Sequence, residues 1–140
     1  MKIVIDTNIF VSSLDEKDIF YSECYPIFEK LLDSEIEAIC PLIILVETIC
    51  AIRRRINNTD ITFEIYKNLI DLPSIKWLEI TMDMAGQVCL WGNKTGLKGG
   101  DAIILHVAHS YNIPLLTMDK EIKIKAPKDI LIYTPVDIKV

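Results

Sequence analysis

The sequence predicts an α/β fold in three layers, with a mostly parallel central sheet of about five strands flanked by helices. Two observations support this. Apolar runs of strand length alternate with segments of helical periodicity along most of the chain. The first run, residues 3–5, is continuously apolar and β-branched, which is typical of a parallel strand covered on both faces. With 140 residues, one domain over residues 1–140 is expected.

The expected strands share short apolar or alternating runs bounded by turn residues, and they fall at 1–5, 35–40, 75–80, 115–118 and 130–133. The expected helices share apolar residues at helical spacing, and they fall at 9–14 (a helix or turn), 21–32, 42–55, 62–72, 81–93 and 101–111. Pro41 opens a helix, Thr81 caps one and Asn112 ends one. Gly99-Gly100 is expected to be a turn. Helices between nearly all strands favour parallel pairing.

Composition excludes several function classes. A net charge of −5 argues against a general nucleic-acid coat, although a nuclease whose carboxylates hold metal remains compatible with it. The four cysteines are widely spaced without a Cys-x-x-Cys pair, and the chain begins with a strand rather than a signal segment, so reduced thiols are expected. No apolar run approaches the roughly 20 residues of a membrane span. We therefore expect a soluble, cytoplasmic protein with no membrane association.

Two carboxylates follow predicted strands. Asp6 ends the first apolar run and Asp119 follows 115–118, so both are expected at the carboxyl edge of the sheet, where ligands bind in such folds. The simpler alternative is that Asp6 caps the next helix and that Asp119 is an ordinary loop aspartate. Asp101, after two glycines, opens a helix and is open to the same capping interpretation.

Glu47 lies in a helix that is apolar nearly all round. Its neighbours three and four positions away include no base, and the basic run 53–55 begins too far along the helix for direct contact. If the carboxylate is buried, it needs a distant partner, a raised pKa or a metal. A metal site shared with Asp6, Asp101 and Asp119 explains all four acids, and oxygen-only ligands favour one or two Mg²⁺ or Mn²⁺ ions over zinc. The two histidines are expected to serve packing.

These residues resemble the PIN domain, particularly the VapC toxin ribonucleases. The resemblance is carried by Asp6-Thr7-Asn8 after a strand, Glu47 in an apolar helix, Asp101 opening a helix and Thr117-x-Asp119 after a strand. It implies a Mg²⁺- or Mn²⁺-dependent endoribonuclease with the four acids around the metal. The residues implied to support them are Thr7, Asn8 and Thr117. It also implies a small antitoxin partner and a homodimer.

The sequence departs from that family at one place. Many relatives follow the last aspartate with a second acid and an aromatic, whereas Lys120-Glu121-Ile122 stands here, so Glu121 is either an outer metal-site acid or a surface charge.

The expected reaction is hydrolysis of RNA phosphodiester bonds by metal-bound water. Three lysines could contact the RNA backbone or could simply be solvated: Lys94, Lys98 and Lys120.

Two alternatives remain open from the residues. One is a PIN-like module that binds RNA or a protein without cutting. The other is a phosphatase or phosphoacceptor domain that uses Asp6 covalently, which the amide of Asn8 at the position of a second aspartate disfavours.

Overall fold

The computed structural model describes residues 1–138, and its strands form one five-stranded sheet in the order β3-β2-β1-β4-β5. Every neighbouring pair is parallel, which confirms the predicted fold class. The strands are β1 (Lys2–Ile5), β2 (Glu37–Pro41), β3 (Ile75–Leu78), β4 (Leu115–Leu116) and β5 (Ile132–Tyr133). Because Ile5 pairs with Leu116, β1 and β4 end at the same level of the sheet.

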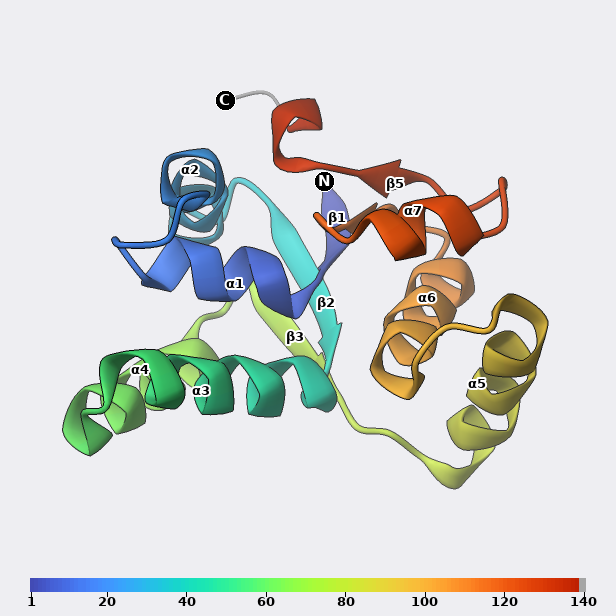
Figure 1. The fold of residues 1–140 in the computed structure, drawn as a ribbon, viewed down its shortest axis with the longest axis horizontal. Helices are drawn as coiled ribbons and strands as arrows, with labels where there is room; N and C mark the ends of the chain where they lie inside the picture. The colour runs from blue at the N-terminus through green and yellow to red at the C-terminus, as the bar shows by residue number, and fades with distance from the viewer. Residues whose placement is uncertain (139–140) are drawn as a thin grey trace.

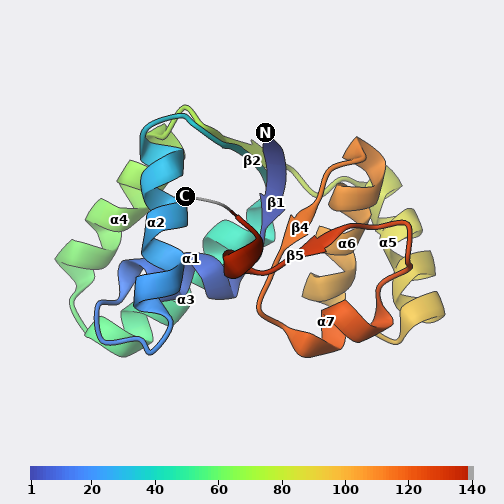
Figure 2. The same ribbon diagram turned by 90° about the horizontal axis from the view of Figure 1, so that it is seen from above.

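Helices follow the strands as predicted. They are α1 (Thr7–Leu14), α2 (Tyr21–Leu32), α3 (Leu42–Ile56), α4 (Thr59–Asp71), α5 (Met82–Thr95), α6 (Gly99–Tyr111), α7 (Lys120–Lys125) and a 3₁₀ turn, η1 (Pro135–Asp137). Figures 1 and 2 both show α1 to α4 gathered on one side of β1 and α5 to α7 on the other. No helix within residues 1–138 is long and apolar enough to cross a bilayer.

Some helix boundaries differ from the predicted ones, and side-chain capping explains the clearest case. Helix α4 begins three residues before the predicted start because Asn58 caps it, its side-chain oxygen accepting from two backbone amides at 3.1 Å. Helix α6 begins at Gly99, so the predicted Gly99-Gly100 turn is instead its first turn. The sequence also failed to predict α7, whose six residues are too short to show a clear period.

The core is built on β1. Ile3, Val4 and Ile5 have no exposed surface, as the continuous apolar run predicted, and α6 packs Ile104 and Leu105 into the same cluster. Burial of each such side chain contributes about 1.5–3 kcal/mol to the free energy of unfolding, because its apolar surface is removed from water. The end of β1 is therefore rigidly held, and the residue that follows it occupies a defined position.

Candidate functional site

The four predicted acids line one cavity of about 280 Å³. Asp6 follows β1, Glu47 lies on α3, Asp101 is in the first turn of α6 and Asp119 precedes α7. The parallel pairing of β1 with β4 brings two of these acids together, since both strands deliver the next residues to one edge. The structure thus places side chains from four separate elements around one space.

Asp6 is both a helix cap and a cavity residue. Its Oδ1 accepts from the Thr7 backbone N–H at 2.7 Å, and its Oδ2 accepts from the Thr117 hydroxyl at 2.7 Å. Burial leaves 7% of the residue exposed and is the main reason that its pKa is raised to about 6. The two hydrogen bonds oppose that rise, while the nearby charges of Asp101 and Glu47 add to it. Asp6 therefore caps α1 and also lines the cavity, so its capping role does not exclude a role in a site.

Thr117 connects Asp6 to Asp119. Its hydroxyl, almost completely buried, donates to Asp6 and accepts from the Asp119 backbone N–H at 3.0 Å. Asn8 adds a longer bond of 3.3 Å from its amide nitrogen to Asp6 Oδ2, and its amide oxygen accepts from the Met118 backbone N–H at 3.4 Å. The loops after β1 and β4 are thus tied to each other through their polar side chains.

Glu47 is not buried, so the need for a buried partner, which applied only to a buried carboxylate, does not arise. The residue is exposed, because α3 turns this position toward the cavity rather than into the core. Its Oε1 accepts from the Thr7 hydroxyl at 3.0 Å. Gly100 lies alongside, and a Cβ added there would stand 3.5 Å from Glu47 Oε2. The absence of a local base was predicted correctly, but solvent and a hydroxyl, rather than a buried partner, accommodate the charge.

Asp101 and Asp119 complete the acidic end of the cavity. The pKa of Asp101 is raised, first by burial and then by the charges of Asp119 and Glu47, while Lys98 opposes the rise. Asp119 caps α7, its Oδ1 accepting from the Glu121 backbone N–H at 2.8 Å. Asp119, for which an ordinary loop aspartate was the simpler alternative, instead caps α7 and also lines the cavity.

Glu121 is engaged outside the cavity. Its Oε1 forms an ion pair of 2.7 Å with Lys125, and this bond lowers the pKa of the carboxyl. It does not line the space between the other acids, although its charge contributes to the raised pKa of Asp101. The arrangement favours the surface-charge interpretation of Glu121.

The chemistry of this donor set fits a hard divalent cation. Within the described chain, no three His, Cys, Asp or Glu side chains stand close enough together to hold an ion directly. The charges of Glu47 and Asp101 nevertheless raise the pKa of Asp6, and the charges of Glu47 and Asp119 raise the pKa of Asp101, so a bound cation would favour the ionised form of both aspartates. Mg²⁺ typically takes one or two carboxylates and keeps several waters, which suits spaced oxygen donors, and no imidazole or thiolate lines the cavity.

The three lysines predicted to contact RNA are spread apart. Lys98 immediately precedes α6 and its charge lowers the pKa of Asp101, and Lys120 is exposed at the start of α7. Lys94 instead lies 5.5 Å from the centre of the Trp91 ring, in a second cavity between α5 and α6. Of the three, Lys98 is thus the one whose charge acts on a cavity acid.

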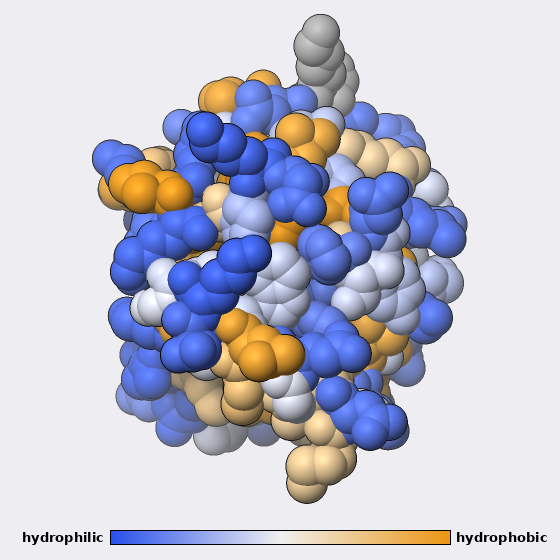
Figure 3. Space-filling view, turned by 90° about the vertical axis from the view of Figure 1, so that its right-hand side faces the viewer, coloured by the Kyte–Doolittle hydropathy of each residue, from blue (hydrophilic) through white to orange (hydrophobic). Residues whose placement is uncertain are grey.

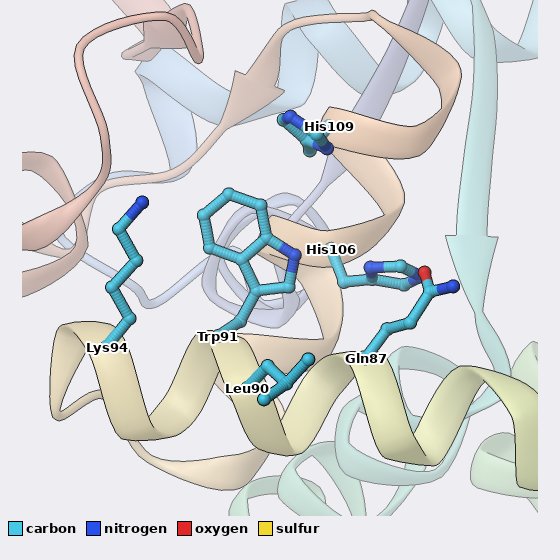
Figure 4. Close-up of a pocket in the computed structure, with 6 residues that line it drawn as sticks. All are labelled: Gln87, Leu90, Trp91, Lys94, His106 and His109. Carbon is cyan, nitrogen blue, oxygen red and sulfur yellow. The ribbon is translucent and has the colours of Figure 1, made fainter.

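The second cavity also contains the two histidines (Figure 4). His106 is buried, with Nε2 3.2 Å from the Ser110 hydroxyl, and burial lowers its pKa. The His109 ring meets the edge of Trp91 at 4.9 Å between centroids. Both histidines pack against neighbouring side chains and neither lines the acid cavity. This side of the molecule, seen in Figure 3, mixes hydrophilic and hydrophobic residues.

Sequence reasoning missed one charged residue of the acid cavity, Arg55. It was considered only as part of the basic run 53–55, which begins too far along the helix for direct contact with Glu47. The available signal was its spacing of eight from Glu47, which places both on one side of α3.

Comparison with known proteins gives one family and several similar structures. A family model described as the PIN domain matches residues 3–127. No curated protein matches the sequence. VapC20 from Mycobacterium tuberculosis, described as a sarcin-ricin loop cleaving toxin, superposes with a TM-score of 0.75 at 14% identity, covering 92% of this chain and 98% of that one.

Two further structures are similar. A toxin–antitoxin complex from Klebsiella pneumoniae gives a TM-score of 0.68 at 19% identity, covering 96% of this chain and 98% of the other. FitAcB from Neisseria gonorrhoeae gives a TM-score of 0.68 at 16% identity, covering 99% of this chain and 100% of that one. At these identities the likeness establishes the fold.

Proposed function

This chain belongs to the PIN domain family, and we propose that it is a Mg²⁺- or Mn²⁺-dependent endoribonuclease, the toxin of a type II toxin–antitoxin pair. One observation carries the nuclease proposal: four acids from four separate elements line a single cavity at the carboxyl edge of the sheet. Residues 1–140 would form a single PIN-like nuclease domain. The similar structures, which include a toxin and a toxin–antitoxin complex, support the toxin assignment.

Asp6 and Asp101 would hold the ion directly, with Glu47 and Asp119 binding it directly or through water. When bound, one or two such ions lower the pKa of a water molecule and neutralise charge on the phosphate. Asp6 must be ionised for this task. The Thr117 hydroxyl and the Thr7 backbone N–H both donate to its carboxylate, so they favour the charged form that burial disfavours.

The other residues around the acids would set their orientation. The Thr7 hydroxyl donates to Oε1 of Glu47, and Oε2 lies 3.5 Å from where a Cβ on Gly100 would stand. Thr117 fixes the backbone that presents Asp119. No side-chain nucleophile is needed, because water attacks the phosphorus. Lys98 would contact the RNA backbone near Asp101, Lys120 would contact it near Asp119, and Lys94 would contact it outside the acid cavity.

The partners proposed are RNA as substrate, a small antitoxin protein and a second copy of this chain. A cytoplasmic location is consistent with the four cysteines, which are all free, two of them buried and two exposed. An adjacent reading frame that encodes a short DNA-binding protein would support the toxin assignment over a housekeeping nuclease. Growth arrest on expression of the wild type, relieved by co-expression of that neighbour, would test it directly.

RNA cleavage tests the catalytic proposal. Purified wild type should cut a structured RNA panel with Mn²⁺ or Mg²⁺ and should fail to cut with EDTA, whereas Asp101→Asn should be inactive under both conditions. The matched control is Asp83→Asn, which removes the same charge from the first turn of the neighbouring α5 at an exposed position outside the cavity. It should cut like the wild type.

Three results would contradict the proposal. Equal cutting by wild type and Asp101→Asn would point to a contaminating nuclease. Binding of RNA without cleavage under all metal conditions would favour the non-catalytic module. A covalent phosphate on Asp6 would favour the phosphoacceptor alternative.

A further inference from the structure

Among residues 1–138, Arg55 is the one cationic residue that lines the acid cavity, and the nuclease proposal assigns it no task. It shares one side of α3 with Glu47 and Ala51, since the three are spaced by four positions. Eight residues of helix separate Glu47 from Arg55 by about 12 Å. The cavity is therefore a groove with carboxylates at one end and a guanidinium at the other.

The groove between those two ends carries no charge. Helix α1 supplies Val11 and Ser12, both buried, and α3 supplies the half-buried Ala51. A phosphodiester chain that lay along this surface would meet no carboxylate between Glu47 and Arg55. Carboxylates that would repel the strand therefore stand only at the two ends of this path, with Glu47 and the other acids at one end and Asp15 and Asp18 beside Arg55 at the other.

Two carboxylates of the loop between α1 and α2 hold Arg55 in place. Its Nη1 lies 3.0 Å from Asp15 Oδ2 and 2.7 Å from Asp18 Oδ2. The other oxygen of each aspartate accepts a backbone N–H, from Lys17 at 3.0 Å and from Phe20 at 2.8 Å. Both carboxylates are therefore fixed by their own loop, and they fix the guanidinium in turn.

The guanidinium still has donors to offer. Both ion pairs use Nη1, so the three N–H groups on Nε and Nη2 have no hydrogen-bond partner within the described chain. The side chain remains 43% exposed. A planar guanidinium held at one corner, with its remaining N–H groups free, matches the paired oxygens of a phosphate.

We propose that Arg55 binds a phosphate of the RNA strand one or two nucleotides from the bond that is cut, so that the groove between α1 and α3 sets the path of the strand. This inference rests on the proposed nuclease function. Asp15 and Asp18 act as positioning residues that hold the guanidinium in the groove. Arg55 does not take part in bond cleavage; it places the scissile phosphate over the acids.

The test measures the affinity for a short single-stranded RNA as a function of salt, in an Asp101→Asn background that prevents cleavage. Adding Arg55→Gln should raise Kd roughly 10-fold at low salt, because a charge-assisted contact is lost. It should also reduce the slope of log Kd against log salt by about 0.7, the value for one phosphate of a single strand. The matched control is Arg54→Gln, an exposed neighbour on the same helix that removes the same charge outside the groove. It should leave the slope unchanged.

Arg55→Lys provides the second variant, because it keeps the charge beside Asp15 and Asp18 but loses the planar fork. It should restore the salt slope and recover only part of the affinity. Equal changes in slope for Arg55→Gln and Arg54→Gln would refute the proposal, since charge alone would then explain them. If Arg55→Gln unfolds, as a melting curve would reveal, Arg55→Met takes its place, and a salt slope unchanged from that of the Asp101→Asn background refutes the proposal.

The two proposals fail in different ways. A wild type that cuts RNA while the Arg55 variants bind like their control keeps the nuclease function and overturns the role of Arg55. A wild type that neither binds nor cuts any RNA of the panel overturns both.

Discussion

Replacement of Asp6 by Asn should stabilise the metal-free protein at neutral pH. In the folded state the pKa of this buried carboxyl is raised from 3.8 to about 6. The folded protein therefore keeps a proton that the unfolded chain releases, and stability is lost as the pH rises from about 4 to about 6. At about 1.4 kcal/mol for each pH unit, the ionised Asp6 costs about 3 kcal/mol above pH 6.

The asparagine retains most of the local contacts. Its oxygen can still accept from the Thr7 backbone N–H, and its amide can donate to the Thr117 hydroxyl, while the bond of 3.3 Å from Asn8 is lost at a cost of about 1 kcal/mol. The expected net gain for Asp6→Asn is about 2 kcal/mol at pH 7.5 in EDTA, with no gain near pH 4.

Urea denaturation from pH 4 to pH 8 measures this difference. Glu121→Gln is the control. Lys125 lowers the pKa of Glu121, so ionisation of this carboxyl has the opposite effect on stability: the carboxylate stabilises the fold at neutral pH and loses its contribution as the pH falls. This control should not be stabilised at pH 7.5. A free-energy difference between wild type and Asp6→Asn that did not change with pH would refute the electrostatic reasoning.

Added metal should make the wild type more stable than Asp6→Asn. Mg²⁺ or Mn²⁺ at 100 times its Kd stabilises a protein that binds it by about 2.7 kcal/mol, which would offset the cost of the ionised Asp6 in the wild type. The variant, which lacks this ligand, should gain much less. If millimolar Mg²⁺ or Mn²⁺ shifts the melting temperature of neither protein, the shared metal site is refuted.

Two other substitutions separate stability from catalysis. Thr117→Val should lower the free energy of unfolding, measured by urea denaturation, by about 1–3 kcal/mol, because it leaves the Asp119 backbone N–H without its acceptor and removes a donor to Asp6. Thr117→Ser, which keeps the hydroxyl, should retain most of the stability. A Thr117→Val variant as stable as the wild type would contradict this hydrogen-bond network. Glu47→Gln should change the free energy of unfolding by no more than about 0.5 kcal/mol, since the residue is exposed, yet should lower RNA cleavage at least about 10-fold; a large loss of stability would indicate a structural charge instead.

The sequence by itself determined the sheet and most of its helices. The continuously apolar Ile3–Ile5 could be satisfied only by a strand buried on both faces, and the helical spacing over 21–32 predicted α2 with its observed bounds. These features are readable because the period of apolar residues depends on local geometry alone. The positions of Asp6 and Asp119 after strands followed from the same logic.

Only the tertiary structure decided how charges are accommodated. Whether Glu47 is buried depends on which side of α3 faces α1, and an almost wholly apolar helix does not reveal that side. The partners of Arg55, Asp15 and Asp18, are separated from it by about forty residues, so no local pattern connects them. The sequence specified which acids reach the edge of the sheet. The packing of α1 against α3 gave them a groove with a cation at its far end, because contacts between distant segments form only when the chain has folded.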